Sequence, residues 1–181
     1  MDELRDRFTS TVVPHMDAAY NLARWLVRDA HDAEDVVQDA FMRALRHFGG
    51  FRGTDPRPWL LAIVRNASYA LLRSRHPAEL VDLEELGDDG ELADRTPFSN
   101  PEAAVIRNAE RRLLNEAIAA LPVAYREALI LRELEDLSYR EIALISEVPV
   151  GTVMSRLSRA RRLLAQGLRA ILVAADHEAL G

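Results

Sequence analysis

Apolar side chains recur every three or four residues along most of the chain, and no stretch alternates between apolar and polar residues as a half-buried strand would. This spacing predicts an all-α protein. Three helices are expected before residue 76, and each has one apolar stripe to bury. The stripes consist of Val12, Met16, Ala19, Ala23 and Leu26 in the first helix, of Val37, Phe41, Leu45 and Phe48 in the second, and of Leu60, Val64, Ala67 and Leu71 in the third.

Residues with strong capping or turn preferences mark the ends of these helices. Asp32 is the expected N-cap of the second helix, and Gly49-Gly50 ends it. The third helix is expected to begin among residues 56–58, which include two prolines, and to end near Arg75. The loop between these two helices is rich in glycine, and Phe51 is its one large apolar side chain.

The helical pattern is lost between residues 77 and 99. Acids, glycine and proline accumulate there, and Arg95 is the only basic residue of this stretch. Such a composition is typical of a flexible linker. We therefore predict two small helical domains, residues 1–76 and 100–175, joined by an acidic linker.

Prolines mark the first two helices of the second domain. Asn100-Pro101 offers an N-cap followed by proline at the first helical position, which predicts a helix to about Leu121. Pro122 begins the next helix, which should run to about Glu135. Both helices precede the most informative stretch of the sequence.

Residues 138–164 predict a helix-turn-helix. Ser138 and Glu141 have the spacing of a capping box, the short helix that they open ends near Ser146, and a turn leads to a second helix from about Gly151. One face of that second helix is apolar and comprises Val153, Leu157, Ala160 and Leu164. The opposite face comprises Ser155, Ser158, Arg159 and Arg162. In DNA-binding proteins this second helix enters the major groove, whereas an ordinary helical hairpin would leave the same arginine face to solvent.

Charge is distributed unevenly along the chain, although the formal net charge is -6. Between residues 40 and 76 the ionisable side chains other than histidine are arginines, with Asp55 as the single acid. Residues 149–170 contain arginines and no acid. Two basic segments are thus separated by the acidic linker, and this distribution favours nucleic acid as a partner despite the overall negative charge.

The composition gives no positive sign of catalysis. The chain has no cysteine, which excludes disulfides and thiolate zinc sites, and its five histidines show no metal-binding spacing. A Walker-type phosphate loop needs a lysine, and the chain has none. We expect a protein that is not an enzyme and holds no cofactor or metal. No apolar run is long enough to cross a bilayer, and the N-terminus lacks a signal pattern, so a cytoplasmic protein is expected.

Four motifs resemble those of bacterial RNA polymerase sigma factors of the extracytoplasmic-function (ECF) type, group 4 of the sigma-70 family. Residues 149–161, PVGTVMSRLSRAR, closely resemble the pattern P-x-G-T-V-[KR]-S-R-x-x-R-[AG]-R. Residues 32–41 resemble region 2.2, residues 59–66 resemble W-L-x-x-I-x-R-N, and residues 121–127 resemble L-P-x-x-x-R-E. Because the four stand in family order over most of the chain, it is identified as a member of this family. The resemblance implies a region 2-like first domain and a region 4-like second domain.

The resemblance also implies partners and roles. An ECF sigma factor binds core RNA polymerase at the β′ clamp coiled coil and the β flap, directs initiation at promoter DNA, and is a target of an anti-sigma factor. The β′ contact would use one face of the second helix, with Asp35, Gln38 and Met42.

DNA contacts are implied on both domains. The minus-10 element, read as unpaired DNA, would contact Phe51, Arg57, Arg65, Asn66, Tyr69 and Arg73. Of these, Arg65, Tyr69 and Arg73 are expected on one exposed helical face. The minus-35 duplex would contact Thr152, Ser155, Arg156, Ser158, Arg159 and Arg162. Met154 stands where the family often has lysine or arginine. Trp59 continues the buried stripe of its helix and is expected in the core, with base stacking as the alternative.

Two other functions remain open at this point. A LuxR-like transcription regulator would contain a similar helix-turn-helix and bind DNA without core polymerase. A helical interaction scaffold would have no role in DNA binding. The first domain discriminates, because a LuxR-like regulator would carry a sensor or receiver domain there.

Overall fold

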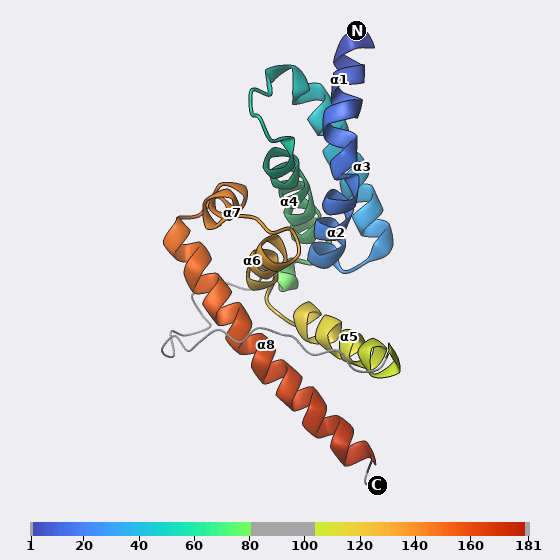
Figure 1. Cartoon of the computed structure of the whole chain (residues 1–181), viewed down its shortest axis with the longest axis vertical. Coiled ribbons are helices and arrows are strands. Elements are labelled where there is room, and N and C mark those ends of the chain that lie inside the picture. Colours follow the sequence, from blue (N-terminus) through green and yellow to red (C-terminus); the bar gives the residue numbers. More distant parts are fainter. Residues whose placement is uncertain (1, 81–103, 180–181) are drawn as a thin grey trace.

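The computed structural model describes residues 2–80 and 104–179, and all the regular elements within these ranges are helices (Figure 1). The prediction of an all-α protein is confirmed. Residues 81–103, which include most of the expected acidic linker and the helix start expected at Asn100-Pro101, lie outside the described residues.

The N-terminal half, residues 2–80, is built from four α-helices and three short 3₁₀ turns. Helices α2, α3 and α4 pack against one another around a core that includes Leu22, Leu26, Ala40, Leu60 and Val64, while α1 packs against α4. The elements are α1 (Asp2–Val12), η1 (Val13–His15), α2 (Met16–Val27), α3 (Ala30–His47), η2 (Phe48–Gly50), α4 (Pro56–Arg75) and η3 (Pro77–Glu79).

The first expected helix is in fact two helices. The 3₁₀ turn η1, which contains Pro14, separates α1 from α2. Val12, Ala19 and Leu26 are buried as expected, but Met16 at the start of α2 is exposed. Proline cannot donate a backbone hydrogen bond, so a break at this point is consistent with its chemistry.

The second expected helix, α3, begins before the predicted position. Asp29, not Asp32, is its N-cap, and the Asp29 carboxylate accepts a hydrogen bond of 2.9 Å from the backbone N–H of Asp32. Asp32 instead lies buried in the first turn and forms an ion pair with Arg75 of α4. The deepest residues of α3 are alanines and a valine, one position away from the predicted stripe, because small side chains allow close packing. Val36, Ala40 and Ala44 are fully buried, whereas Val37, Phe41 and Leu45 are partly buried around them.

The C-terminal half consists of α5 (Ala104–Ala119), α6 (Val123–Glu133), α7 (Tyr139–Ser146) and α8 (Val150–Ala179). Helix α6 is central and is buried from Tyr125 to Leu131 without interruption, as expected for a helix that has neighbours on all sides. Helices α7 and α8 form the predicted helix-turn-helix. The capping box is confirmed, since Ser138 Oγ accepts from the N–H of Glu141 at 3.2 Å and the Glu141 carboxylate accepts from the N–H of Ser138 at 2.8 Å.

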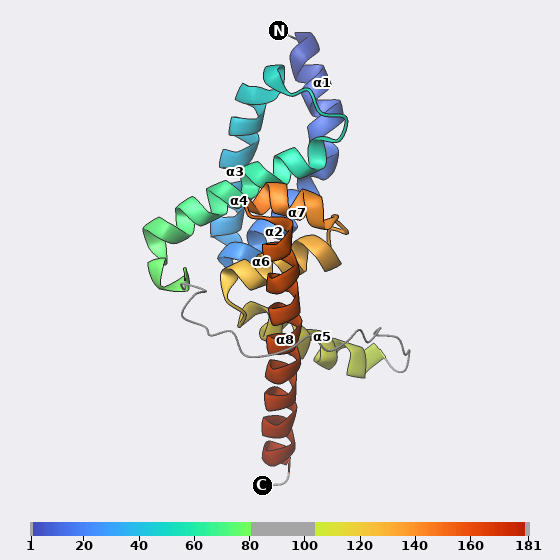
Figure 2. The same ribbon diagram turned by 90° about the vertical axis from the view of Figure 1, so that its left-hand side faces the viewer.

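The two halves pack against each other in this structure. Helix α6 lies against α2, and α7 lies against α4, so helices from opposite ends of the sequence share an interface (Figures 1 and 2). The C-terminal part of α8 extends away from this interface (Figure 2). The interface matters for function because α4 carries most of the residues predicted to read the minus-10 element.

Candidate nucleic-acid and protein interfaces

One face of α3 is exposed and carries the three predicted core-binding residues. Asp35, Gln38 and Met42 are separated by three and four residues, which places them on one side of a helix. All three are exposed, and Met42 retains half of its accessible surface although it is apolar. The opposite side of α3 is held in the core by its buried alanines. The structure therefore presents these residues together to solvent, as the sequence predicted.

The loop before α4 contains a group of aromatic rings. The Phe51 ring packs 4.9 Å from Trp59 and is stacked at 6.1 Å on Phe48, measured between ring centroids. Trp59 is partly buried and packs on the core, as expected. Asp55 is the N-cap of α4 and accepts from the N–H of Arg57 at 2.9 Å.

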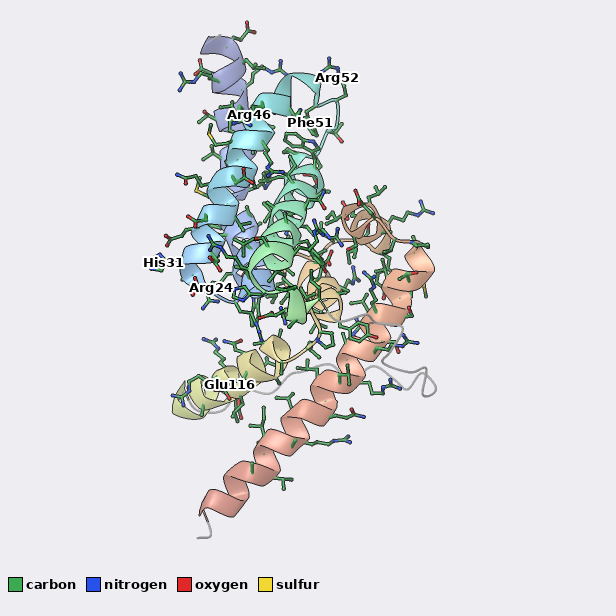
Figure 3. All side chains as sticks on the ribbon, turned by 180° about the vertical axis from the view of Figure 1, so that it is seen from behind. Arg24, His31, Arg46, Phe51, Arg52 and Glu116 are labelled. Carbon is green, nitrogen blue, oxygen red and sulfur yellow. The ribbon has the colours of Figure 1, made fainter. Side chains whose placement is uncertain are left out.

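An open hollow of about 670 Å³ lies beside this aromatic group. Figure 3 shows Phe51 and Arg52 at the end of the N-terminal half that is remote from Glu116 of α5. No acidic side chain is among the residues that line the hollow, which are Arg7, Thr11, Phe48, Gly49, Phe51, Arg52, Gly53 and Thr54. A lining of aromatic rings, hydroxyls and arginines suits a nucleotide better than a cation.

The predicted DNA-reading face of α4 is partly covered by the C-terminal half. Glu127 of α6 accepts from Arg65 Nε at 2.9 Å and from the Tyr69 hydroxyl at 2.5 Å. The Arg65 side chain is only 14% exposed and Glu127 is fully buried. The expectation of an exposed face for Arg65 and Tyr69 is therefore wrong, because Glu127 of α6 binds both side chains and helix α7 packs against α4.

Burial and the neighbouring charge of Glu127 fix the protonation of this cluster. Burial first, and then the Glu127 carboxylate, raise the pKa of Tyr69, so its hydroxyl stays a neutral donor. Burial alone would lower the pKa of Arg65, but Glu127 and Tyr69 outweigh it and raise the pKa. A charged guanidinium and a neutral phenol thus share one carboxylate.

The remaining predicted minus-10 residues divide into covered and exposed side chains. Arg57 Nη2 donates at 2.6 Å to both the backbone carbonyl and the carboxylate of Glu135, a buried residue that follows α6. Asn66 and Arg73 of α4 are exposed, and the Asn66 side chain accepts from Arg65 at 3.3 Å. The C-terminal half therefore contacts some but not all of the predicted minus-10 residues.

The start of α8 positions the predicted minus-35 residues. Val153, Leu157 and Ala160 are buried and fix the orientation of the helix, while Leu164 is partly buried. Ser155 and Met154 are exposed. The other predicted residues are partly exposed: Thr152, Arg156, Ser158, Arg159 and Arg162.

Arg126 holds several structural elements together. The sequence analysis placed it in the motif of residues 121–127 but predicted no structural role for it. It is 1% exposed and donates to four backbone carbonyls. The carbonyls of Trp25 (2.7 Å) and Leu26 (3.1 Å) lie in the last turn of α2. The carbonyl of Ala119 (3.0 Å) belongs to the last residue of α5, and that of Leu121 (2.6 Å) follows this helix. Burial, and then the charge of nearby Arg28, lower the pKa of Arg126 to about 10. One guanidinium thus joins the two halves of the molecule.

The signal for this arrangement is visible in the sequence in hindsight. Arg126 and Glu127 are adjacent charges inside a run that is otherwise mostly apolar, and α6 is buried on all sides. Buried charges need partners, so such a pair indicates contacts on two different sides of the helix.

Among residues 2–80 and 104–179, no group of three or more histidine, aspartate or glutamate side chains is placed to hold a metal ion. In the same part of the chain, no helix is both long and apolar enough to cross a membrane.

The sequence matches two known family models. Residues 11–77 match sigma-70 region 2, and residues 111–164 match sigma-70 region 4. The chain is 36% identical over 172 residues to the RNA polymerase sigma-H factor of Pseudomonas aeruginosa, covering 91% of this chain and 88% of that protein. It is 38% identical over 140 residues to the ECF RNA polymerase sigma-E factor of Escherichia coli K12 (74% and 72% covered), and 31% identical to the ECF sigma factor SigW of Bacillus subtilis (91% and 90%).

Two solved structures resemble nearly the whole chain. The sigma factor RpoE in complex with the anti-sigma factor NepR from Bartonella quintana matches with a TM-score of 0.67 and 28% identity, covering 90% of this chain and 96% of that one. CnrH in complex with the cytosolic domain of CnrY matches with a TM-score of 0.64 and 25% identity, covering 92% and 90%.

Proposed function

The chain belongs to the ECF family of RNA polymerase sigma factors, and from this premise we propose how its surfaces divide the work of promoter-directed transcription initiation. The observation that carries the function is the presence of sigma-70 regions 2 and 4 in one chain, in that order. A LuxR-like regulator would have no use for region 2, and a scaffold would have no use for the helix-turn-helix. Neither alternative gains support.

The N-terminal half is proposed to bind core polymerase. Asp35, Gln38 and Met42 form the docking surface for the β′ clamp coiled coil, with the apolar Met42 side chain flanked by polar groups. An exposed methionine beside polar neighbours is a composition common in protein interfaces. The domain limits are proposed as residues 1–76 and 100–175, with residues 77–99 as the acidic linker.

The minus-10 element is proposed to bind α4 and the loop before it. Unpaired bases would stack near Phe51, while Arg57, Arg65, Asn66, Tyr69 and Arg73 supply charge and hydrogen-bond donors along the helix. The support is the acid-free hollow beside Phe51 and the position of these residues on one helix and its preceding loop.

The minus-35 element is proposed to bind the start of α8 in its major groove. Ser155, Ser158, Arg159 and Arg162 would face base edges, and Thr152 and Arg156 would contact phosphates. The buried stripe on the other side of α8 supports this orientation. Met154 is exposed at the centre of this surface and adds an apolar contact in place of a basic one.

Further partners follow from the same premise. We propose that the β flap of core polymerase binds the C-terminal half and that an anti-sigma factor controls the protein. The two similar solved structures are both complexes, and one names its partner as an anti-sigma factor. The chain itself is proposed not to be an enzyme, since the polymerase performs the chemistry, and to act in the cytoplasm where the polymerase is.

A gel-shift experiment with and without core polymerase tests the function. We expect a library of genomic promoter fragments to shift only when core is present, and run-off transcription from the shifted fragments to start at defined positions. A shift without core would instead identify a self-sufficient regulator. No shift under either condition would support the scaffold.

A further inference from the structure

The first six residues of α8, VGTVMS (residues 150–155), contain no charged and no amide side chain. They form the end of the helix that enters the major groove in a helix-turn-helix. Base pairs are commonly read there by arginine or lysine bound to guanine, or by asparagine or glutamine bound to adenine. The first side chain of any of these kinds in α8 is Arg156. Base reading by the first six residues must therefore use other contacts.

Two apolar side chains face solvent at this end of α8. Met154 is 54% exposed and Val150 is 38% exposed. They lie four residues apart, so they are neighbours on one side of the helix. Val153 is buried and fixes the rotation of the helix, so Met154 is directed away from the core. Gly151 is also exposed, and a side chain added there would meet no atom within 4 Å, so no other part of the described chain covers this turn.

The hydroxyl next to Met154 is placed to act as an acceptor. Ser155 is exposed, and its hydroxyl donates to the Thr152 carbonyl at 3.0 Å within the helix. A serine oxygen whose hydrogen is used in this way can still accept a hydrogen bond. The start of α8 thus presents an apolar side chain at Met154 and an acceptor beside it.

The base pair that complements this surface is thymine with adenine. In the major groove thymine presents its C5-methyl group, and adenine presents an N6 amino donor. Guanine would instead place its O6 and N7 acceptors against an apolar side chain, where they lose water and gain no donor. Cytosine presents a donor but no methyl group. Contact between a methyl group and the methionine side chain is favourable because it removes apolar surface of both from water.

We propose that Met154 is a specificity-determining residue, which packs on the C5-methyl group of a thymine in the minus-35 element. The inference rests on the proposed binding of the minus-35 duplex by α8, and it adds the base that one side chain of this helix selects. Sigma factors of this type often have lysine or arginine at the corresponding position, and such a side chain suits guanine. This chain should therefore prefer a different base at that step of the promoter.

A uracil substitution isolates the methyl group. Deoxyuridine has the same hydrogen-bonding groups as thymidine and lacks only the C5-methyl. The holoenzyme first selects its minus-35 element from a duplex library randomised in that region, and each selected thymine is then replaced by deoxyuridine in turn. Holoenzyme affinity is measured by competition against the selected duplex, followed by fluorescence anisotropy. We expect one thymine at which the replacement weakens binding about fourfold, as for the loss of one buried methyl group.

Two variants at Met154 and one matched control complete the experiment. Met154→Ala should abolish the difference between thymine and uracil at that base, because the contact to the methyl group is gone. Met154→Arg should move the preferred base there to guanine. Leu134→Ala is the control, since Leu134 follows α6 and is 52% exposed, so a similar apolar surface is removed elsewhere. The control should retain the full difference between thymine and uracil. All the substituted side chains are exposed, and circular dichroism checks that the helices are intact.

The outcomes distinguish this proposal from the proposed function. Arg159→Ala, on the same helix, reports whether α8 binds the minus-35 duplex at all. If Arg159→Ala weakens binding to the selected element, but no thymine shows a uracil effect that depends on Met154, the proposal alone is overturned. If the library yields no minus-35 preference and Arg159→Ala has no effect, the proposed function of α8 fails and the proposal with it.

A protein contact at Met154 is the remaining alternative. It predicts that Met154→Ala weakens association with core polymerase in the absence of DNA and leaves the difference between thymine and uracil unchanged, and this result would also overturn the proposal. A uracil effect at one thymine that is lost in Met154→Ala and kept in Leu134→Ala supports it.

Discussion

Arg126 is the residue on which both halves of the molecule depend. Its planar guanidinium presents five donors in a fixed fork, and four backbone carbonyls from two helix ends accept from it. These carbonyls carry the partial negative charge of a helix C-terminus, which favours a cation. Even with its pKa lowered to about 10, Arg126 is charged at neutral pH. The charge is therefore stabilised mainly by these carbonyls, with the Glu79 carboxylate 4.0 Å away as a more distant partner.

The first prediction is that lysine cannot replace this arginine. Arg126→Lys keeps the charge but presents donors from one point, so at least one buried carbonyl loses its partner. An unpaired buried group costs about 1–3 kcal/mol, and we expect the free energy of unfolding to fall by about that amount. Urea denaturation followed by circular dichroism measures it. Arg161→Lys, at an exposed ion pair, serves as the control and should change stability by less than about 0.5 kcal/mol. Equal losses in both variants would show that the four carbonyl contacts contribute nothing.

Sequence reasoning was successful at residues whose partners are close in the chain. The Ser138–Glu141 capping box was predicted because its two bonds join residues three positions apart. Arg126 and Trp25 lie 101 positions apart, and no periodicity or cap reports on such a contact. The prediction that Tyr69 is exposed failed because its partner is equally distant in the sequence: Glu127, which accepts from the Tyr69 hydroxyl, belongs to the other half.

Among the helices, α3 shows how the phase of a stripe is decided by packing. Two apolar stripes fit a helical repeat in this segment, one that includes Val36 and one that includes Val37. The second was predicted to be buried because it contains the larger side chains of Phe41 and Leu45. The structure buries Val36 and the alanines instead, because α2 and α4 approach α3 closely on that side. The exposed face was predicted correctly all the same, since Asp35 and Gln38 lie outside either stripe.

The second prediction concerns this exposed face of α3. Asp35→Arg reverses a charge at the centre of the proposed β′ contact, and we expect core polymerase to bind at least about tenfold more weakly, because like or unpaired charges at an interface cost several kcal/mol. Fluorescence titration of labelled chain with core measures the affinity. Circular dichroism should be unchanged, as Asp35 is exposed.

A charge-matched control accompanies this variant. Glu116→Arg changes the net charge equally on α5, whose position is labelled in Figure 3, and should leave the contact at α3 intact. If both variants weaken core binding to the same extent, the effect is one of overall charge and the assignment of α3 is wrong.

The whole molecule must place α4 on the minus-10 element and α8 on the minus-35 element of the same promoter. Elements about two duplex turns apart lie roughly 70 Å from each other along the DNA. In the structure, α7 of the helix-turn-helix packs directly on α4, the helix proposed to read the minus-10 element. The sequence predicted both domains and their helices from local patterns. It could not predict their contact, because that depends on surfaces that meet only after each half has folded.

The last prediction separates the two reading helices by the form of DNA that each one binds. Arg159 lies on α8, where a contact to a base in the major groove would contribute about 1–3 kcal/mol to discrimination, so Arg159→Ala should weaken holoenzyme binding to minus-35 duplex by about tenfold or more. Asn66 lies exposed on α4, where it would meet bases only after the strands part. Asn66→Ala should therefore leave duplex binding unchanged and reduce permanganate reactivity of unpaired thymines near the start site.

The two substitutions control for each other, since both remove one exposed or partly exposed polar side chain from a helix. Duplex binding by α8 precedes strand separation at α4. Arg159→Ala should therefore reduce strand separation only when the holoenzyme does not saturate the promoter DNA, whereas the defect of Asn66→Ala should persist when the DNA is saturated. Equal losses of duplex affinity in both variants would contradict this division between α4 and α8.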